Sequence, residues 1–106
     1  MIKIKNKYWV EDPHPDNQIK TYYLYFIKCN NYIKIGYSEN PKKRLEVIQV
    51  SNPYRCNIIL TIGYLGETDA KNHELYWHKL CKEFKVRGEW FKYKKGVEIW
   101  LKDITG

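Results

Sequence analysis

Residues 22–44 constrain the fold of this chain more than any other stretch. Two runs rich in aromatic and β-branched side chains, residues 22–28 and 32–37, flank a Cys-Asn-Asn turn, and asparagine tolerates the positive φ that tight turns need. Asn40 and Pro41 follow. This pair is typical of a helix start, because asparagine caps free backbone N–H groups and proline needs no N–H there. The stretch therefore predicts a β-hairpin that runs into a helix.

The expected hairpin brings two polar side chains together. A turn of two or four residues pairs odd with even positions, so Tyr25 and Lys34 should point to the same face of the sheet. If Lys28 pairs with Asn31, they lie directly opposite each other, and a phenol neighbours an ammonium. Arg44 stands one helical turn before an isoleucine, so we expect it to lean toward the sheet.

The remaining segments indicate an α+β class with a small antiparallel three-stranded sheet flanked by helices. Residues 56–64 predict a third strand, residues 68–84 a longer helix, and residues 89–93 a short final strand. A last amphipathic helix is expected within residues 94–106. Residues 1–21 are interpreted as an N-terminal extension without an assigned role.

The longer helix carries an acidic residue on its apolar side. Glu74 falls on a stripe formed by Ala70, Trp77, Cys81 and Phe84. A carboxylate on an inward face is rarely left without a partner or a metal. Helix geometry alone favours a structural pairing of Glu74, with a lysine or with His78, over a metal ligand.

Composition and charge restrict the partners. The chain has 106 residues, which is enough for one domain, and a formal net charge of +7. This charge favours a polyanionic partner, although basic surfaces also serve solubility. Tyrosines among lysines can stack on bases, and packing in the sheet is the alternative. No apolar run is long enough to span a membrane and no signal-peptide core is evident, so we expect a cytoplasmic or nuclear protein without membrane contact.

Several motifs, in order, resemble the GIY-YIG nuclease superfamily. Residues 23–25 (Tyr-Leu-Tyr) stand where the family has Gly-Ile-Tyr, and residues 34–36 (Lys-Ile-Gly) where it has Tyr-Ile-Gly. Ser38, Asn40 and Arg44 follow at the family's spacing. Residues 74–78 look like the helix with the family's metal-binding glutamate, and residues 87–91 (Arg-Gly-Glu-Trp-Phe) are similar to the ending of a compact phage-type branch. The resemblance covers about residues 22–93, which we take as the nuclease-like domain.

The resemblance implies a metal-dependent endonuclease that hydrolyses DNA phosphodiester bonds. Tyr25 would be the general base, helped by the neighbouring Lys34, because a free tyrosine titrates near pH ~10. Arg44 would grip phosphate, and Glu74 would hold one Mg²⁺ or Mn²⁺. His78 is placed either for proton transfer or for a structural role. In a phage-encoded protein the host cytoplasm would be the place of action.

The sequence departs from the family pattern at three positions. Tyr23 replaces the first glycine, Lys34 replaces the second tyrosine, and Ile48 stands where some members have a helix histidine. Tyr32 and Tyr37 flank the expected site as neighbouring or packing residues.

Binding without cutting is the main alternative function. The expected DNA contacts are Lys34, Lys42, Lys43, Arg44 and Arg87. The same basic face would serve a non-catalytic DNA-binding module, and a protein-interaction module in a replication or defence complex is a third hypothesis. No separate DNA-reading module is evident, so targeting would fall to a partner protein, to fused copies in longer proteins or to substrate shape. The sequence leaves the oligomeric state, DNA or RNA, and the strand preference open.

Overall fold

The computed structural model describes residues 20–105. The expected N-terminal extension therefore lies almost wholly outside the described residues. Nine elements follow one another: β1 (Thr21–Cys29), β2 (Tyr32–Ser38), α1 (Pro41–Val50), β3 (Cys56–Leu65), α2 (Glu67–Leu80), the 3₁₀ turn η2 (Lys82–Phe84), β4 (Lys85–Arg87), β5 (Trp90–Lys92) and α3 (Lys95–Thr105).

All strands join one antiparallel sheet in the order β3-β1-β2-β5-β4. The expected α+β class is confirmed, but the expected count of three strands is wrong, because the sheet has five. The β4–β5 hairpin extends the sheet beyond β2. Each of its strands is only three residues long, which is too short for an alternating pattern to mark both of them.

The hairpin turn contains only Asn30 and Asn31, and Asn30 has a φ of 57°. Cys29 therefore pairs with Tyr32, so that Tyr25 lies opposite Gly36 and Lys34 opposite Ile27. The shared face of Tyr25 and Lys34 is confirmed, but their direct opposition is wrong by two positions. The expected turn at residues 29 and 30 is shifted by one residue, to Asn30 and Asn31, which changes every pairing by two positions.

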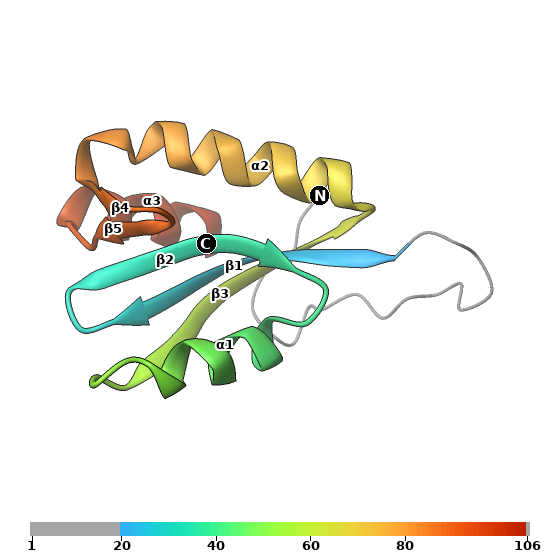
Figure 1. Cartoon of the computed structure of the whole chain (residues 1–106). Coiled ribbons are helices and arrows are strands. Elements are labelled where there is room, and N and C mark those ends of the chain that lie inside the picture. Colours follow the sequence, from blue (N-terminus) through green and yellow to red (C-terminus); the bar gives the residue numbers. More distant parts are fainter. Residues whose placement is uncertain (1–19, 106) are drawn as a thin grey trace.

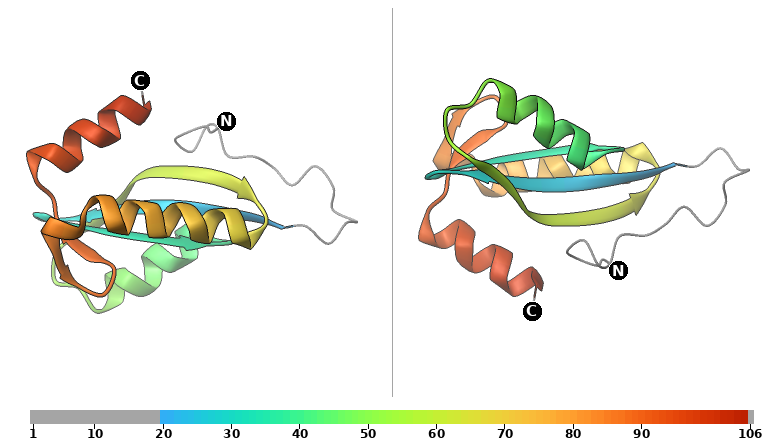
Figure 2. Two further views of the ribbon diagram at one scale, coloured as in Figure 1. Left: turned by 90° about the horizontal axis from the view of Figure 1, so that it is seen from above. Right: turned by 90° about the horizontal axis from the view of Figure 1, so that it is seen from below.

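Helices cover both faces of the sheet (Figures 1 and 2). Helix α1 lies on one face and α2 on the other. The helix α1 begins as expected, because the Asn40 side chain accepts a hydrogen bond from the backbone N–H of Lys43 at 3.1 Å and Pro41 occupies the first turn. No helix among residues 20–105 is long and apolar enough to cross a membrane.

Two apolar clusters occupy the two faces. The larger one joins sheet residues such as Phe26 and Phe91 to Trp77 of α2 and Leu101 of α3. The smaller one, under α1, includes Tyr25, Ile27, Cys29 and Cys56, with Trp90 packed against it. The expected inward stripe of the longer helix is present, although α2 ends at Leu80 and continues only as η2.

Candidate functional site at the open edge of β2

The site forms where β2 runs beyond its short partner β5. The pairing of β2 with β5 ends at Lys34. One residue further, the backbone N–H of Ile35 donates to the carbonyl oxygen of Glu89 at 3.0 Å. The Ile35 carbonyl accepts from Nε2 of His78 at 2.8 Å. These two contacts fix the segment before β5 and the helix α2 against the same strand edge.

Gly36 lets side chains from the two segments that flank β2 meet at this edge. A Cβ at position 36 would lie 2.5 Å from Oη of Tyr25 and 2.7 Å from Oε1 of Glu89. No ordinary side-chain carbon approaches another atom so closely. The glycine is therefore required for space, and it allows the phenol and the Glu89 carboxylate to converge over the bare backbone.

Tyr25 is buried, with 1% of its surface exposed, and is held by an arginine. Nε of Arg44 donates to Oη of Tyr25 at 3.4 Å, so the expected lean of Arg44 toward the sheet is observed. Burial raises the pKa of Tyr25, the Arg44 contact lowers it, and the nearby Glu89 and Glu74 carboxylates raise it. The net direction is upward, so Tyr25 is a neutral phenol at neutral pH.

Lys34 does not serve as the cation beside the phenol. Its Nζ lies 3.4 Å from Oε1 of Glu89 and 5.2 Å from the centre of the Trp90 ring. Arg44 takes the position against Tyr25 that the sequence suggested for Lys34. The hairpin register differs by two residues from the expected one, so Lys34 lies opposite Ile27 and Arg44 is the cation that contacts Tyr25.

Glu74 reaches the edge from α2 and is only 9% exposed. Burial raises its pKa, as does the nearby Glu89 carboxylate, while His78 and Lys71 lower it. Among residues 20–105 its carboxylate has no ion pair with a cationic side chain, and its side-chain hydrogen-bond contact is with the Glu89 carboxyl group. The structural pairing with a lysine or with His78 is thus not formed. The ring of His78 instead satisfies a backbone carbonyl.

Glu89 is the site residue that sequence reasoning missed. Its Oε1 is shielded from solvent and accepts no hydrogen bond, although the Lys34 ammonium lies 3.4 Å away. In the sequence analysis Glu89 appeared only as part of residues 87–91, the motif that resembles the ending of the phage-type branch, and no role was given to it. The available signal was an acidic residue between Gly88, which has a positive φ of 54°, and the first residue of a strand.

The two carboxylates fit a hard divalent cation with open coordination. No group of three or more metal-binding side chains occurs within residues 20–105. Mg²⁺, however, keeps several waters and is usually bound by one or two carboxylates plus substrate phosphate. The buried Oε1 of Glu89 and the neighbouring Glu74 carboxylate, which has no cationic partner among the described residues, provide such a pair.

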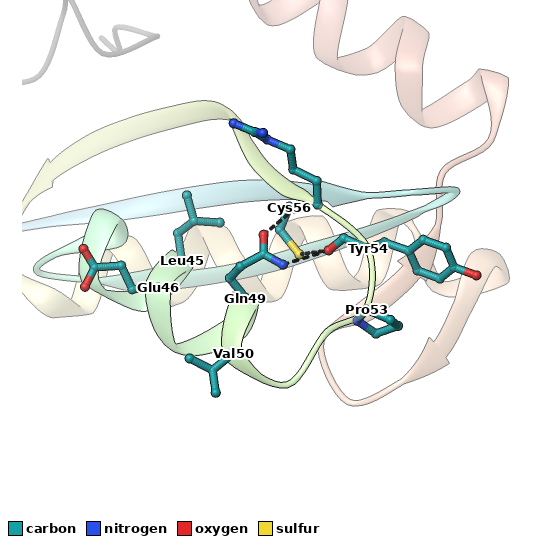
Figure 3. A pocket seen from close by; sticks show the side chains of 8 residues that line it. Leu45, Glu46, Gln49, Val50, Pro53, Tyr54 and Cys56 are labelled. Carbon is teal, nitrogen blue, oxygen red and sulfur yellow. Dashed lines mark hydrogen bonds between the residues drawn. The ribbon is translucent and has the colours of Figure 1, made fainter.

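Two hollows of the described surface are lined by residues outside this cluster. One of about 700 Å³ lies between α1 and β3 (Figure 3), where Oε1 of Gln49 accepts from the Cys56 N–H at 2.7 Å and Nε2 donates to the Tyr54 carbonyl at 2.9 Å. These bonds anchor the loop after α1. A second hollow, of about 430 Å³, is lined by residues of the same loop and of the β4–β5 hairpin. Tyr25, Arg44, Glu74 and Glu89 line neither hollow.

The other expected DNA contacts are exposed. Lys42 and Lys43 lie in the first turn of α1 beside Arg44, and Arg87 ends β4. Arg44 itself is exposed as a residue although its Nε faces the sheet. Basic groups therefore stand at the start of α1 and on the short hairpin.

Comparison with known proteins adds a family. The sequence matches the T5orf172 domain over residues 21–105. It is also similar to protein 315L of Invertebrate iridescent virus 6, which is named for a KilA-N domain, with 28% identity over 105 residues. That match covers 92% of this chain but 44% of the viral protein, so the chain spans less than half the length of this curated relative. No solved structure matches the chain.

Proposed function

This chain belongs to the T5orf172 domain family of phage-associated, nuclease-like domains, and on that premise we propose that it is a metal-dependent endonuclease of the GIY-YIG type. The observation that carries the proposal is the convergence of a guanidinium and two carboxylates around the Tyr25 phenol. The substrate class is nucleic acid, with DNA the first choice.

The reaction is hydrolysis of a phosphodiester. A water oxygen attacks phosphorus, the bond from phosphorus to the leaving oxygen breaks, and the proton of the water passes to a base. Tyr25 is that base in our proposal, because its hydroxyl lies beside a cation and at the open edge. Arg44, which donates to Tyr25 only through Nε, has further N–H groups for phosphate oxygens.

Glu74 and Glu89 would hold Mg²⁺ or Mn²⁺. When bound, the ion supplies positive charge for the leaving oxygen. Neutralising the two carboxylates also removes the charges that raise the pKa of Tyr25, which leaves burial opposed by Arg44. Loss of the Tyr25 proton is thereby coupled to occupation of the carboxylate pair.

The two other site residues receive supporting roles. Lys34 positions Glu89 through their 3.4 Å contact and lies close enough to the edge for a phosphate. His78 positions α2 by its bond to the Ile35 carbonyl, and we assign it no proton transfer. Lys42, Lys43 and Arg87 would contact the backbone of the nucleic acid. A partner protein or further domains would supply targeting.

Binding without cleavage is the second candidate, and the burial of Tyr25 favours it. A phenol that is 1% exposed, with a raised pKa, is a poor base until something lowers that pKa. The exposed basic groups would still bind phosphates.

The test compares cleavage and metal binding in matched variants. Plasmid and single-stranded DNA are incubated with the parent, Glu74→Gln, Glu89→Gln and the exposed control Glu83→Gln, with Mg²⁺, with Mn²⁺ and with chelator. Binding of Mn²⁺ is measured on the same proteins by electron paramagnetic resonance. We expect both site variants to lose cleavage and Mn²⁺ affinity, while Glu83→Gln keeps both.

Two outcomes would overturn the proposal. Full cleavage by Glu74→Gln would place the metal elsewhere. A parent that binds DNA but does not cut with either metal would replace the enzyme by the binding module.

A further inference from the structure

A second feature adjoins the site on the α1 face of the sheet. The hollow of about 430 Å³ lies between the loop after α1 and the β4–β5 hairpin. Its walls include Tyr32, Tyr54 and Trp90, with Arg87 beside them. We call it the aromatic groove. Its volume lies within the range of about 300–1,000 Å³ found for small-ligand sites, toward the lower end.

The aromatic rings of this groove are open to solvent. Tyr32 is 41% exposed and Tyr54 is 55% exposed, so neither contributes its full area to the core. The Tyr54 ring points away from Leu45 and Val50 (Figure 3). Trp90 packs partly against the cluster under α1 and so forms a firm wall. Exposed aromatic faces that border a hollow are available to a flat ligand.

Positive charge surrounds the same rings. Nζ of Lys34 lies 5.2 Å from the centre of the Trp90 ring. Lys92 is paired across the sheet with Tyr32, and Arg87 lines the groove. Glu89, which neighbours Trp90, already has Lys34 as its partner. A ligand with an aromatic ring and an attached anionic group matches these surroundings.

The groove and the candidate site share one strand face. Tyr32, Lys34 and Gly36 alternate along β2 on the side that faces α1. With a rise of ~3.3 Å per residue, Tyr32 and Gly36 are about 13 Å apart along the strand. A chain of nucleotides could therefore reach from the groove past Lys34 to Tyr25 and Arg44.

We propose that the aromatic groove binds an unpaired base of a single-stranded nucleic-acid segment, which stacks on Tyr54 and Tyr32 while its phosphates lie toward Lys34 and Arg87. The domain would then favour single strands or locally opened sites over closed duplex, because a paired base cannot leave its stack without losing its pairing. This inference rests on the proposed function in one respect, namely that nucleic acid is the substrate class.

The experiment measures binding in the presence of chelator, so that cleavage plays no part. Fluorescence anisotropy compares a labelled short oligothymidylate with a closed hairpin duplex, and an oligouridylate serves as the RNA arm. The proteins are the parent, Tyr32→Ala, Tyr54→Ala, Tyr54→Phe and the control Tyr76→Ala, whose ring is exposed on α2 outside the groove. Thermal melts verify that each variant is folded.

We expect each groove alanine to weaken single-strand binding about tenfold, since stacking on an aromatic ring contributes that order of affinity. Duplex binding should change less than about twofold, because phosphate contacts carry it. Tyr54→Phe keeps the ring and should bind like the parent, and so should Tyr76→Ala. Similar losses for DNA and RNA would support base stacking without sugar recognition, and a loss for one alone would assign the groove to that nucleic acid.

Three results would overturn the inference. Equal losses of affinity for single strand and duplex would mean that the tyrosines contact nucleic acid without regard to base pairing. Unchanged single-strand affinity in the groove variants would mean that the groove does not bind nucleic acid. A dimer of the parent that dissociates in Tyr54→Ala would assign the groove to a second copy of the chain. Each result is independent of whether Glu74→Gln stops cleavage, so a failure of the nuclease proposal is distinguishable from a failure here.

Discussion

Replacing Glu74 with glutamine should make the fold more stable while it removes the proposed metal ligand. The carboxylate is 9% exposed, has no cationic partner among residues 20–105 and lies against the carboxyl group of Glu89, which cannot donate a hydrogen bond when both groups are ionised. A buried polar group without a partner costs roughly 1–3 kcal/mol. Glutamine keeps the shape, removes the charge and can donate to Glu89. We expect the free energy of unfolding to rise by about 1–2 kcal/mol, which is roughly 4–8 °C in Tm for a domain of this size.

The pH dependence gives the prediction a sign. The pKa of Glu74 is raised above its ordinary value of 4.5, first by burial and then by Glu89. A carboxyl group whose pKa is higher in the folded than in the unfolded state stabilises the fold while it is protonated. That stabilisation is complete below the pKa of the unfolded state and is lost as the pH rises through the pKa of the folded state. The parent should therefore approach the stability of Glu74→Gln as pH falls from neutral toward 4.5. Added Mg²⁺ should stabilise the parent and leave the variant nearly unchanged.

Thermal denaturation at neutral and acidic pH, with and without Mg²⁺, measures all of these differences. Glu83→Gln is the control, because its carboxylate is exposed in η2 and its replacement should shift Tm little. A Glu74→Gln protein that melts below the parent at neutral pH would refute the reasoning, because the carboxylate would then be stabilised by its surroundings.

Three further predictions concern Gly36, Arg44 and two buried titratable side chains. Gly36→Ala should lower the free energy of unfolding by about 1–3 kcal/mol in denaturant titrations, whereas Gly96→Ala, whose Cβ would meet only Phe84 at 3.9 Å, should not; equal stability of both variants would contradict the crowding at Gly36. Arg44→Ala should lose cleavage together with part of the DNA affinity, measured by plasmid cutting and anisotropy, and unchanged affinity would remove Arg44 from the phosphate contacts. Burial raises the pKa of Tyr64 to about 12 and that of Cys81 to about 11, so the stability that these two groups contribute should be complete below pH 9 and be lost toward pH 11–12; urea titrations from pH 8 to 12 measure this, and a flat profile over that range would contradict it.

The sequence was informative wherever the pattern was local. Alternation and turn residues in residues 22–37 predicted the hairpin, and Asn40 with Pro41 predicted the helix start that the structure contains. Register was less accessible, because it depended on one backbone angle: the positive φ of Asn30 closes a two-residue turn and moves Lys34 opposite Ile27.

Features that depend on contacts between distant segments could not be predicted from the sequence, for a different reason. The β4–β5 hairpin forms strands because β5 pairs with β2. Its three-residue strands are too short for this pairing to be predicted from their own sequence. Glu89 enters the site only because that pairing carries it to Gly36, far away in the chain. Its place on a helical stripe drew attention to Glu74, the family resemblance gave it a metal role, and that role remains a prediction.

The two hydrogen bonds at Ile35 also protect the edge of the sheet from pairing with strands of other molecules. An open strand edge presents unpaired N–H and carbonyl groups to which a strand of another molecule can add. At Ile35 the Glu89 carbonyl and the His78 ring occupy both groups. A chain that lost the His78 ring would expose that carbonyl as a template, and its first symptom would be self-association during folding.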